Sequence, residues 1–196
     1  GDVISLTPDR CLCYGPPELS GRNVVFQGWH SGPREIWTVN IDTLEQRNLT
    51  NSAYPQFNPS FDGERVVWMD SRNDTSDDPY FSRVNPDIYG MRFPDGELEA
   101  ICTDPSVQLN PTVDGDLVAW EDLRNSSNPN DSMADDANID IYLYQFSTGR
   151  EIQVTSLEGR EERPKLVGHR LFFVAEDLEE RLAVFMIDLD EAGLLD

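Results

Sequence analysis

The sequence predicts an all-β fold of the propeller class, with four blades of four antiparallel strands each. The first observation is a doubled stretch: NPSFDGERVVW at 58–68 occurs again as NPTVDGDLVAW at 110–120. The second is a pair of weaker copies at 17–26 and 163–173. The third is that strand-like segments follow every copy. Repeats of about forty residues with four strands each are typical of propeller blades.

Each copy predicts two strands joined by a tight turn. An alternating segment leads to a glycine, which follows aspartate in the two strong copies, and a short apolar run comes next. Asp-Gly favours two-residue hairpin turns, because glycine adopts positive φ without steric cost. The turn glycines are Gly21, Gly63, Gly115 and Gly168. The second strands are predicted at 23–27, 65–69, 117–121 and 170–174.

Two more strands are predicted in each repeat. The third begins at Glu35, Asp87, Asp140 and Leu182. The fourth covers 46–50, 98–103 and 151–155, each ending in threonine. The predicted single domain therefore has blades at about 16–50, 57–103, 109–155 and 163–188.

The last repeat has no fourth strand of its own. Segment 2–7, DVISLT, is similar to the fourth strand at 46–50. We therefore expect this N-terminal strand to complete the last blade and close a four-bladed ring, which would remove two open edges. Two alternatives stay open: the chain is a segment of a larger extracellular repeat protein, or half of a ring-completing homodimer.

The repeated pattern resembles the TolB-type β-propeller repeat. The resemblance is strong at 59–72 with 87–89, and at 111–124 with 140–142. The first and last repeats lack the Asp-x-Arg motif and match weakly. The resemblance implies a periplasmic, secreted or cell-surface protein that acts as a binding platform.

The repeated polar and aromatic residues have a structural interpretation. Asp70 and Arg72, like Asp122 and Arg124, can pair at the end of the second strand. The aspartate before each Ile-Tyr is expected to tether the preceding loop. Trp68 and its equivalents are expected to pack between blades, because a large aromatic ring fills the gap between sheets.

Charge narrows the classes of partner. The 196 residues contain 15 Lys and Arg against 37 Asp and Glu, a formal net charge of −22. Such a chain repels phosphate backbones, so nucleic acid is not an expected partner. No apolar run is long enough for membrane insertion. A protein partner is therefore expected. Three cysteines, Cys11, Cys13 and Cys102, allow at most one intrachain bridge.

The connections between second and third strands differ most between repeats. They run from 70 to 86 and from 122 to 139, and both are acidic and rich in asparagine. Long loops in compact domains are often functional. The functional interpretation is a calcium site, and the alternative is a solvated polar loop. No other cofactor is predicted. The candidate ligands are Asp74, Asp77, Asp78, Asp131, Asp135 and Asp136.

The predicted function is a non-catalytic binding or scaffold module that uses this loop face. Its candidate binding surface consists of Trp29, His30, Tyr80 and Phe81, since aromatic residues dominate interface energies. No catalytic residue is assigned, because the sequence contains no nucleophile, P-loop or metalloprotease motif. The alternative is a propeller-fold hydrolase or lyase with carboxylates converging at the central axis.

Overall fold

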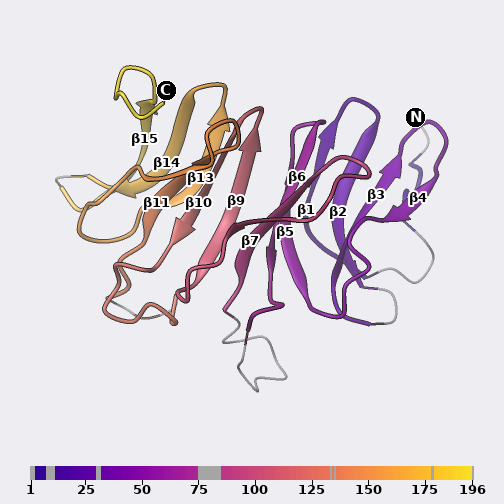
Figure 1. Ribbon diagram of the computed structural model, residues 1–196, viewed down its shortest axis with the longest axis horizontal. Coiled ribbons are helices and arrows are strands. Elements are labelled where there is room, and N and C mark those ends of the chain that lie inside the picture. The colour runs from indigo at the N-terminus through magenta and orange to yellow at the C-terminus, as the bar shows by residue number, and fades with distance from the viewer. Residues whose placement is uncertain are drawn as a thin grey trace.

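The computed structural model describes residues 3–7, 12–29, 32–74, 85–132, 134, 136–177 and 179–195. These residues form four antiparallel sheets and contain no helix. The sheets lie side by side in chain order along the long axis of the molecule (Figure 1). The predicted all-β architecture is confirmed.

The strands match the predicted repeats closely. The first sheet comprises β1 (Leu12–Ser20), β2 (Asn23–Trp29), β3 (Glu35–Asn40) and β4 (Gln46–Asn48). The second comprises β5 (Gln56–Phe61), β6 (Arg65–Asp70), β7 (Asp87–Arg92) and β8 (Glu99–Cys102). The third comprises β9 (Gln108–Asp114), β10 (Leu117–Asp122), β11 (Asp140–Gln145) and β12 (Arg150–Gln153). The fourth comprises β13 (Glu162–Val167), β14 (Arg170–Glu176) and β15 (Leu182–Asp188).

The turn glycines explain why the first two strands of each sheet pair as hairpins. All four have positive φ, from 57° at Gly21 and Gly168 to 107° at Gly63. L-residues with a side chain rarely adopt this conformation, so glycine fixes the turn and thereby the register of the pair.

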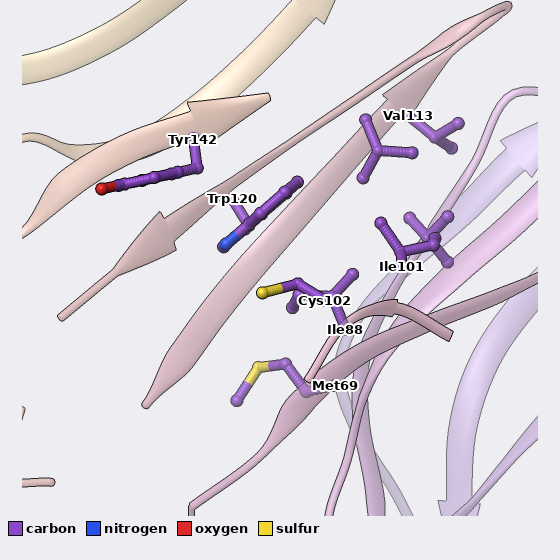
Figure 2. Packing of buried hydrophobic residues seen from close by; sticks show 9 residues of the cluster. Met69, Ile88, Ile101, Cys102, Val113, Trp120 and Tyr142 are labelled. Atoms are coloured by element: carbon purple, nitrogen blue, oxygen red, sulfur yellow. The ribbon is translucent and has the colours of Figure 1, made fainter. Parts of the chain in front are cut away.

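Trp68 and Trp120, at the ends of the two strongest apolar runs, pack between neighbouring sheets, as predicted. Trp120 of the third sheet is fully buried, and its cluster includes Met69 and Ile88 of the second sheet (Figure 2). The indole stacks on Tyr142, with ring centroids 6.2 Å apart. Trp68 of the second sheet is also fully buried, and its cluster includes Val25 and Ile36 of the first sheet. Contacts between sheets therefore form most of the core.

The Asp-x-Arg motif is structural, as predicted. Asp70 is inaccessible to solvent and accepts hydrogen bonds from Trp68 Nε1 at 2.9 Å and from Arg72 Nη2 at 2.7 Å. Burial alone would raise the pKa of Asp70, but the hydrogen bonds, with Arg72 first, lower it. Asp122 accepts equivalent bonds from Trp120 and Arg124. The motif therefore fills the corner where the second strand ends.

The prediction that segment 2–7 completes the last sheet is wrong. Residues 3–7 form no strand, and the carbonyl of Leu6 accepts a hydrogen bond from Gln46 of the first sheet. The two chain ends lie at opposite ends of the molecule (Figure 1). Among the described residues β15 pairs only with β14, and Val184 is 73% exposed where the equivalent Ile141 is fully buried. The four sheets therefore form an arc that is not closed.

Candidate functional site

A solvent-open cavity of about 470 Å³ lies where the third and fourth sheets meet. It is built from two kinds of connection between strands. One is the loop between β10 and β11, and the other is the link from β12 to β13. Its lining combines acidic residues, one arginine and apolar side chains: Asp136, Ala137, Leu157, Glu158, Gly159, Arg160, Glu161, Glu162, Val174, Ala175, Glu176 and Leu182.

The cavity lies where the fourth sheet departs from the repeated pattern. In the second sheet this corner is filled by Asp70 with its partners Arg72 and Trp68. The residue at the position of Asp70, seven residues after the turn glycine, is Ala175 in the fourth sheet. Asp177 stands at the position of Arg72. The small alanine and the absent ion pair leave space that the second and third sheets fill with side chains.

Glu161 occupies the position of Gln56 and Gln108, two residues before the left-handed residue that precedes proline. The backbone geometry is the same in the three sheets. The backbone N–H of each of these residues donates a hydrogen bond to the carbonyl of the residue just before a third strand. For Glu161 the acceptor is the carbonyl of Ile139, at 2.8 Å. Gln56 donates its side-chain amide to Asp70 at 3.0 Å. A carboxylate cannot make that donation, so Glu161 has a different partner.

That partner is Asp140, the first residue of β11. Both residues are 1% exposed. Glu161 Oε2 and Asp140 Oδ1 receive no hydrogen bond from a conventional donor among the described residues. Burial, followed by the charge of Asp140, raises the pKa of Glu161 to about 7 against an opposing hydrogen bond from Thr155. Burial also raises the pKa of Asp140. Ionising both of these neighbouring buried carboxyl groups is costly, because burial disfavours the charged form and like charges repel.

The other oxygen of Asp140 has donors that fix the carboxyl group in place. Asn125 donates to Asp140 Oδ2 at 2.7 Å, and Gln153 donates at 3.2 Å. The aspartate before Ile-Tyr thus tethers its loop, as predicted, and Asn73 makes the matching bond to Asp87 at 2.6 Å. Glu161 therefore faces a carboxyl group that cannot turn away without losing these bonds.

Arg160 does not reach the buried pair. Its Nε donates to Glu162 at 2.7 Å, and its Nη2 donates to the carbonyl of Ser132 at 3.1 Å. Arg160 is the one basic residue against five acidic ones in the described lining. The cavity therefore has a strongly negative potential, which is focused by its apolar walls.

A second concave region lies between the first strands of the sheets. In each sheet a residue with positive φ precedes a proline: Gly15, Asn58, Asn110 and Arg163. These strands line a groove of about 370 Å³. Its one acidic lining residue in the described chain is Glu18, whose carboxylate lies 3.9 Å from Lys165.

A buried carboxylate lies behind this groove. Glu121 Oε1 accepts from the backbone of Arg163 at 2.7 Å, and Oε2 accepts from Asn110 at 2.9 Å. Its role is to join the third and fourth sheets. The hydrolase alternative requires carboxylates that converge on the groove, and the described lining does not contain such a pair.

The predicted binding and metal residues are only partly described. Trp29 ends β2 and is 44% exposed. Asp136 is exposed, accepts a hydrogen bond from Ser127 at 3.0 Å and lines the cavity between the third and fourth sheets. The described residues contain no group of three metal-binding side chains, so the binding surface and the calcium site stay predictions. Six of the predicted residues lie outside the described part of the chain: His30, Asp77, Asp78, Tyr80, Phe81 and Asp135.

The sequence prediction missed Glu161 and Asp140 as a pair. A signal was present, because the repeat QxNP of the second and third units becomes EERP at 161–164. The change from aspartate to Ala175 in the same unit was a second signal. What the sequence did not show is that Glu161 and Asp140, from neighbouring sheets, lie side by side.

No protein-family model matches the sequence, and no curated protein matches it. Among solved structures the chain is similar to TolB from Acinetobacter baumannii, with 18% identity, a TM-score of 0.52, and coverage of 89% of this chain and 43% of that one. It is similar to a structure of a nidogen/laminin complex, with 16% identity, a TM-score of 0.56, and coverage of 91% and 61%. It is also similar to dipeptidyl peptidase 4 from Porphyromonas gingivalis, with 9% identity, a TM-score of 0.62, and coverage of 87% and 23%.

These similarities establish the fold. The chain has a TolB-like β-propeller fold and spans less than two thirds of each of these structures. In the described part of the chain no helix is long and apolar enough to cross a membrane.

Proposed function

We propose that this protein is a non-catalytic module that binds another protein through the loop face of its TolB-like β-propeller fold. The observation that supports this function best is the cavity between the third and fourth sheets. It opens on the loop face, and its volume of about 470 Å³ is in the range of ligand-binding pockets. Its apolar side chains at the mouth, Leu157 and Leu182, are 53% and 77% exposed and offer contact area to a partner.

Two further features favour a protein partner. The net charge of −22 opposes nucleic acid and favours a partner with a basic surface. One of the similar structures is a complex of two proteins, nidogen and laminin. By the same similarity, we place this protein outside the cytoplasm, in the periplasm, in the extracellular space or on the cell surface.

A peptide-display selection on the folded protein tests this function. We expect enriched peptides whose footprint in hydrogen exchange covers the links at 123–139 and 154–161. A footprint confined to the outer strands β4, β8 and β12 would contradict the proposal, and so would a selection without any enrichment. Hydrolysis of the selected peptides would favour the enzyme alternative instead.

Calcium assistance and oligomeric state are separate parts of the proposal. Calcium that binds the native loops must raise the melting temperature, because a ligand specific for the folded state stabilises it. No shift between millimolar calcium and chelator would exclude this role. Light scattering distinguishes a monomer from a ring-completing homodimer through the molecular mass.

A further inference from the structure

We propose that the cavity between the third and fourth sheets binds the basic side chain of a partner protein, whose cationic group pairs with the buried carboxyl group of Glu161. This inference rests on the proposed function and names the chemistry of the partner at that site. It differs from the calcium prediction, which concerns the loop residues 74–78 and 131–136 and has Asp136 in common with the cavity lining.

The geometry supports a cation at this place. Glu161 lines the cavity but is 1% exposed, and its Oε2 lacks a conventional hydrogen-bond donor among the described residues. An ammonium or guanidinium group supplies several donors and a positive charge, and charge-assisted bonds of this kind are the strong ones. The bound cation would meet Glu161 with Asp140 directly behind it.

The cavity walls suit the rest of a basic side chain. Leu157, Val174 and Leu182 form apolar surface at its mouth and side. Lysine and arginine bury their aliphatic stems against such surface while the charged group reaches a polar partner. Burying a free cation is expensive, and the negative groups around the cavity offset that cost.

The charged groups around Glu161 favour a cation from every side. Asp140 comes from β11 and Asp136 from the preceding loop, while Glu158 and Glu162 flank Glu161 along its own segment. Glu176 comes from β14. Arg160 donates hydrogen bonds to the carboxylate of Glu162 and to the carbonyl of Ser132, so it does not neutralise the charge of Glu161 and Asp140.

The pH dependence of binding shows whether the cation competes with a proton at Glu161. Below pH 6 Glu161, with a pKa raised to about 7, is protonated, and a cation must displace that proton. Above pH 8 Glu161 is ionised, and the same cation meets a negative group. Binding of a basic side chain should therefore strengthen as pH rises, in step with the release of one proton.

The test uses three capped tripeptides, Gly-Lys-Gly, Gly-Arg-Gly and Gly-norleucine-Gly, titrated against isotope-labelled protein and followed by NMR. We expect the amide signals of 159–162 to shift with the lysine or arginine peptide. The affinity should be about thirtyfold higher at pH 8 than at pH 5.5, since one proton with a pKa of about 7 is released. The norleucine peptide has the apolar stem without the charge and should cause no comparable shift. Equal shifts with all three would overturn the proposal.

Glu161→Gln is the decisive variant. Glutamine occupies the equivalent positions 56 and 108, so the variant should fold. It should bind the basic peptides about tenfold more weakly at pH 8 and lose the pH dependence. Glu191→Gln, which removes one charge from an exposed position outside the cavity lining, is the matched control and should change binding less than threefold. Equal losses in the two variants would mean general attraction to an acidic surface and would refute the specific site.

The two proposals can fail separately. If display selection yields loop-face ligands that have no basic residue, the binding function stands and the role of Glu161 falls. If selection yields no ligand and the tripeptides do not shift the signals of 159–162, both fall.

Discussion

The side-chain amide of Asn58 donates a hydrogen bond of 2.9 Å to the side-chain oxygen of Asn110. The two residues occupy the same position in neighbouring repeats, and both have positive φ. Asn110 in turn donates to the buried carboxylate of Glu121, which also accepts from the backbone of Arg163. One chain of hydrogen bonds thus joins the second, third and fourth sheets along the groove between their first strands.

Asn110→Ala should destabilise the protein by about 2–3 kcal/mol, because Glu121 loses a donor and alanine is strained at positive φ. Asn110→Gly should cost less than alanine, since glycine adopts this φ freely. Urea unfolding measures both values. Asn58→Ala is the matched control: it has the same backbone strain but leaves the bond to Glu121 intact. Equal costs for Asn58→Ala and Asn110→Ala would contradict this account.

Asp70→Ala should cost about 3–5 kcal/mol, because it leaves Arg72 and the indole of Trp68 without their buried acceptor. The fall in the free energy of unfolding should be accompanied by a change in the tryptophan fluorescence of the native state. Asp95→Ala, which removes an exposed partner of Arg47, should leave the unfolding midpoint unchanged within error. A similar midpoint for the two variants would show that the buried pair is not structural.

The protein should be more stable near pH 5 than at pH 8. The folded state raises the pKa of Glu161 from 4.5 to about 7 and that of Asp87 from 3.8 to about 6, in both cases mainly through burial. An acid with a raised pKa in the folded state binds its proton more tightly there. Its stabilising contribution is complete below the unfolded pKa and is lost as pH rises through the folded value.

Glu161→Gln should remove the loss between pH 6 and pH 8, which we expect to be about 1–3 kcal/mol. Asp87→Asn should instead flatten the curve between pH 4 and pH 6. Thermal unfolding across this range measures both effects. Parallel curves for the wild type and Glu161→Gln would show that the pair with Asp140 holds no proton in the folded protein.

Gly63→Ala should destabilise the protein more than Gly115→Ala, although both glycines occupy the same turn position. A methyl group at Gly63 would lie 2.5 Å from Ser20 Oγ, whereas no atom lies within 4 Å of the corresponding position at Gly115. The φ of Gly63, 107°, is also further from the values that alanine tolerates. Calorimetry should show the larger loss at Gly63, and Ser20→Ala in the same chain should recover part of it. Equal losses would exclude the contact with Ser20 as a cause.

Much of the fold could be predicted from the sequence because each feature of the repeat depends on residues that are close to it in the chain. Positive φ at Gly115, an apolar run ending at Trp120 and an aspartate at Asp140 each act within a few residues of their own position. The third strands begin at the four predicted residues for this reason. The structural roles of Asp70 and of the buried indoles were also predictable, because the repeat shows them in the same order twice.

Ring closure could not be predicted in the same way. The segment at 2–7 resembles a fourth strand, but local similarity does not say which edge it meets. In the structure Leu6 is bound to Gln46 of the first sheet, and β15 keeps an open edge within the described residues. This outcome depends on contacts between segments about forty residues apart, which strand propensity does not encode.

The sequence by itself determined the repeat, its strands and the acidic character of the surface. Only the tertiary structure decided where the chemistry of the site lies. Asp140 begins β11 of the third sheet and Glu161 immediately precedes β13 of the fourth, and each looks ordinary along the chain. They form a buried acidic pair because the third and fourth sheets pack together around both carboxyl groups. Burial and proximity are properties of that packing, and they raise the pKa of Glu161 toward neutrality.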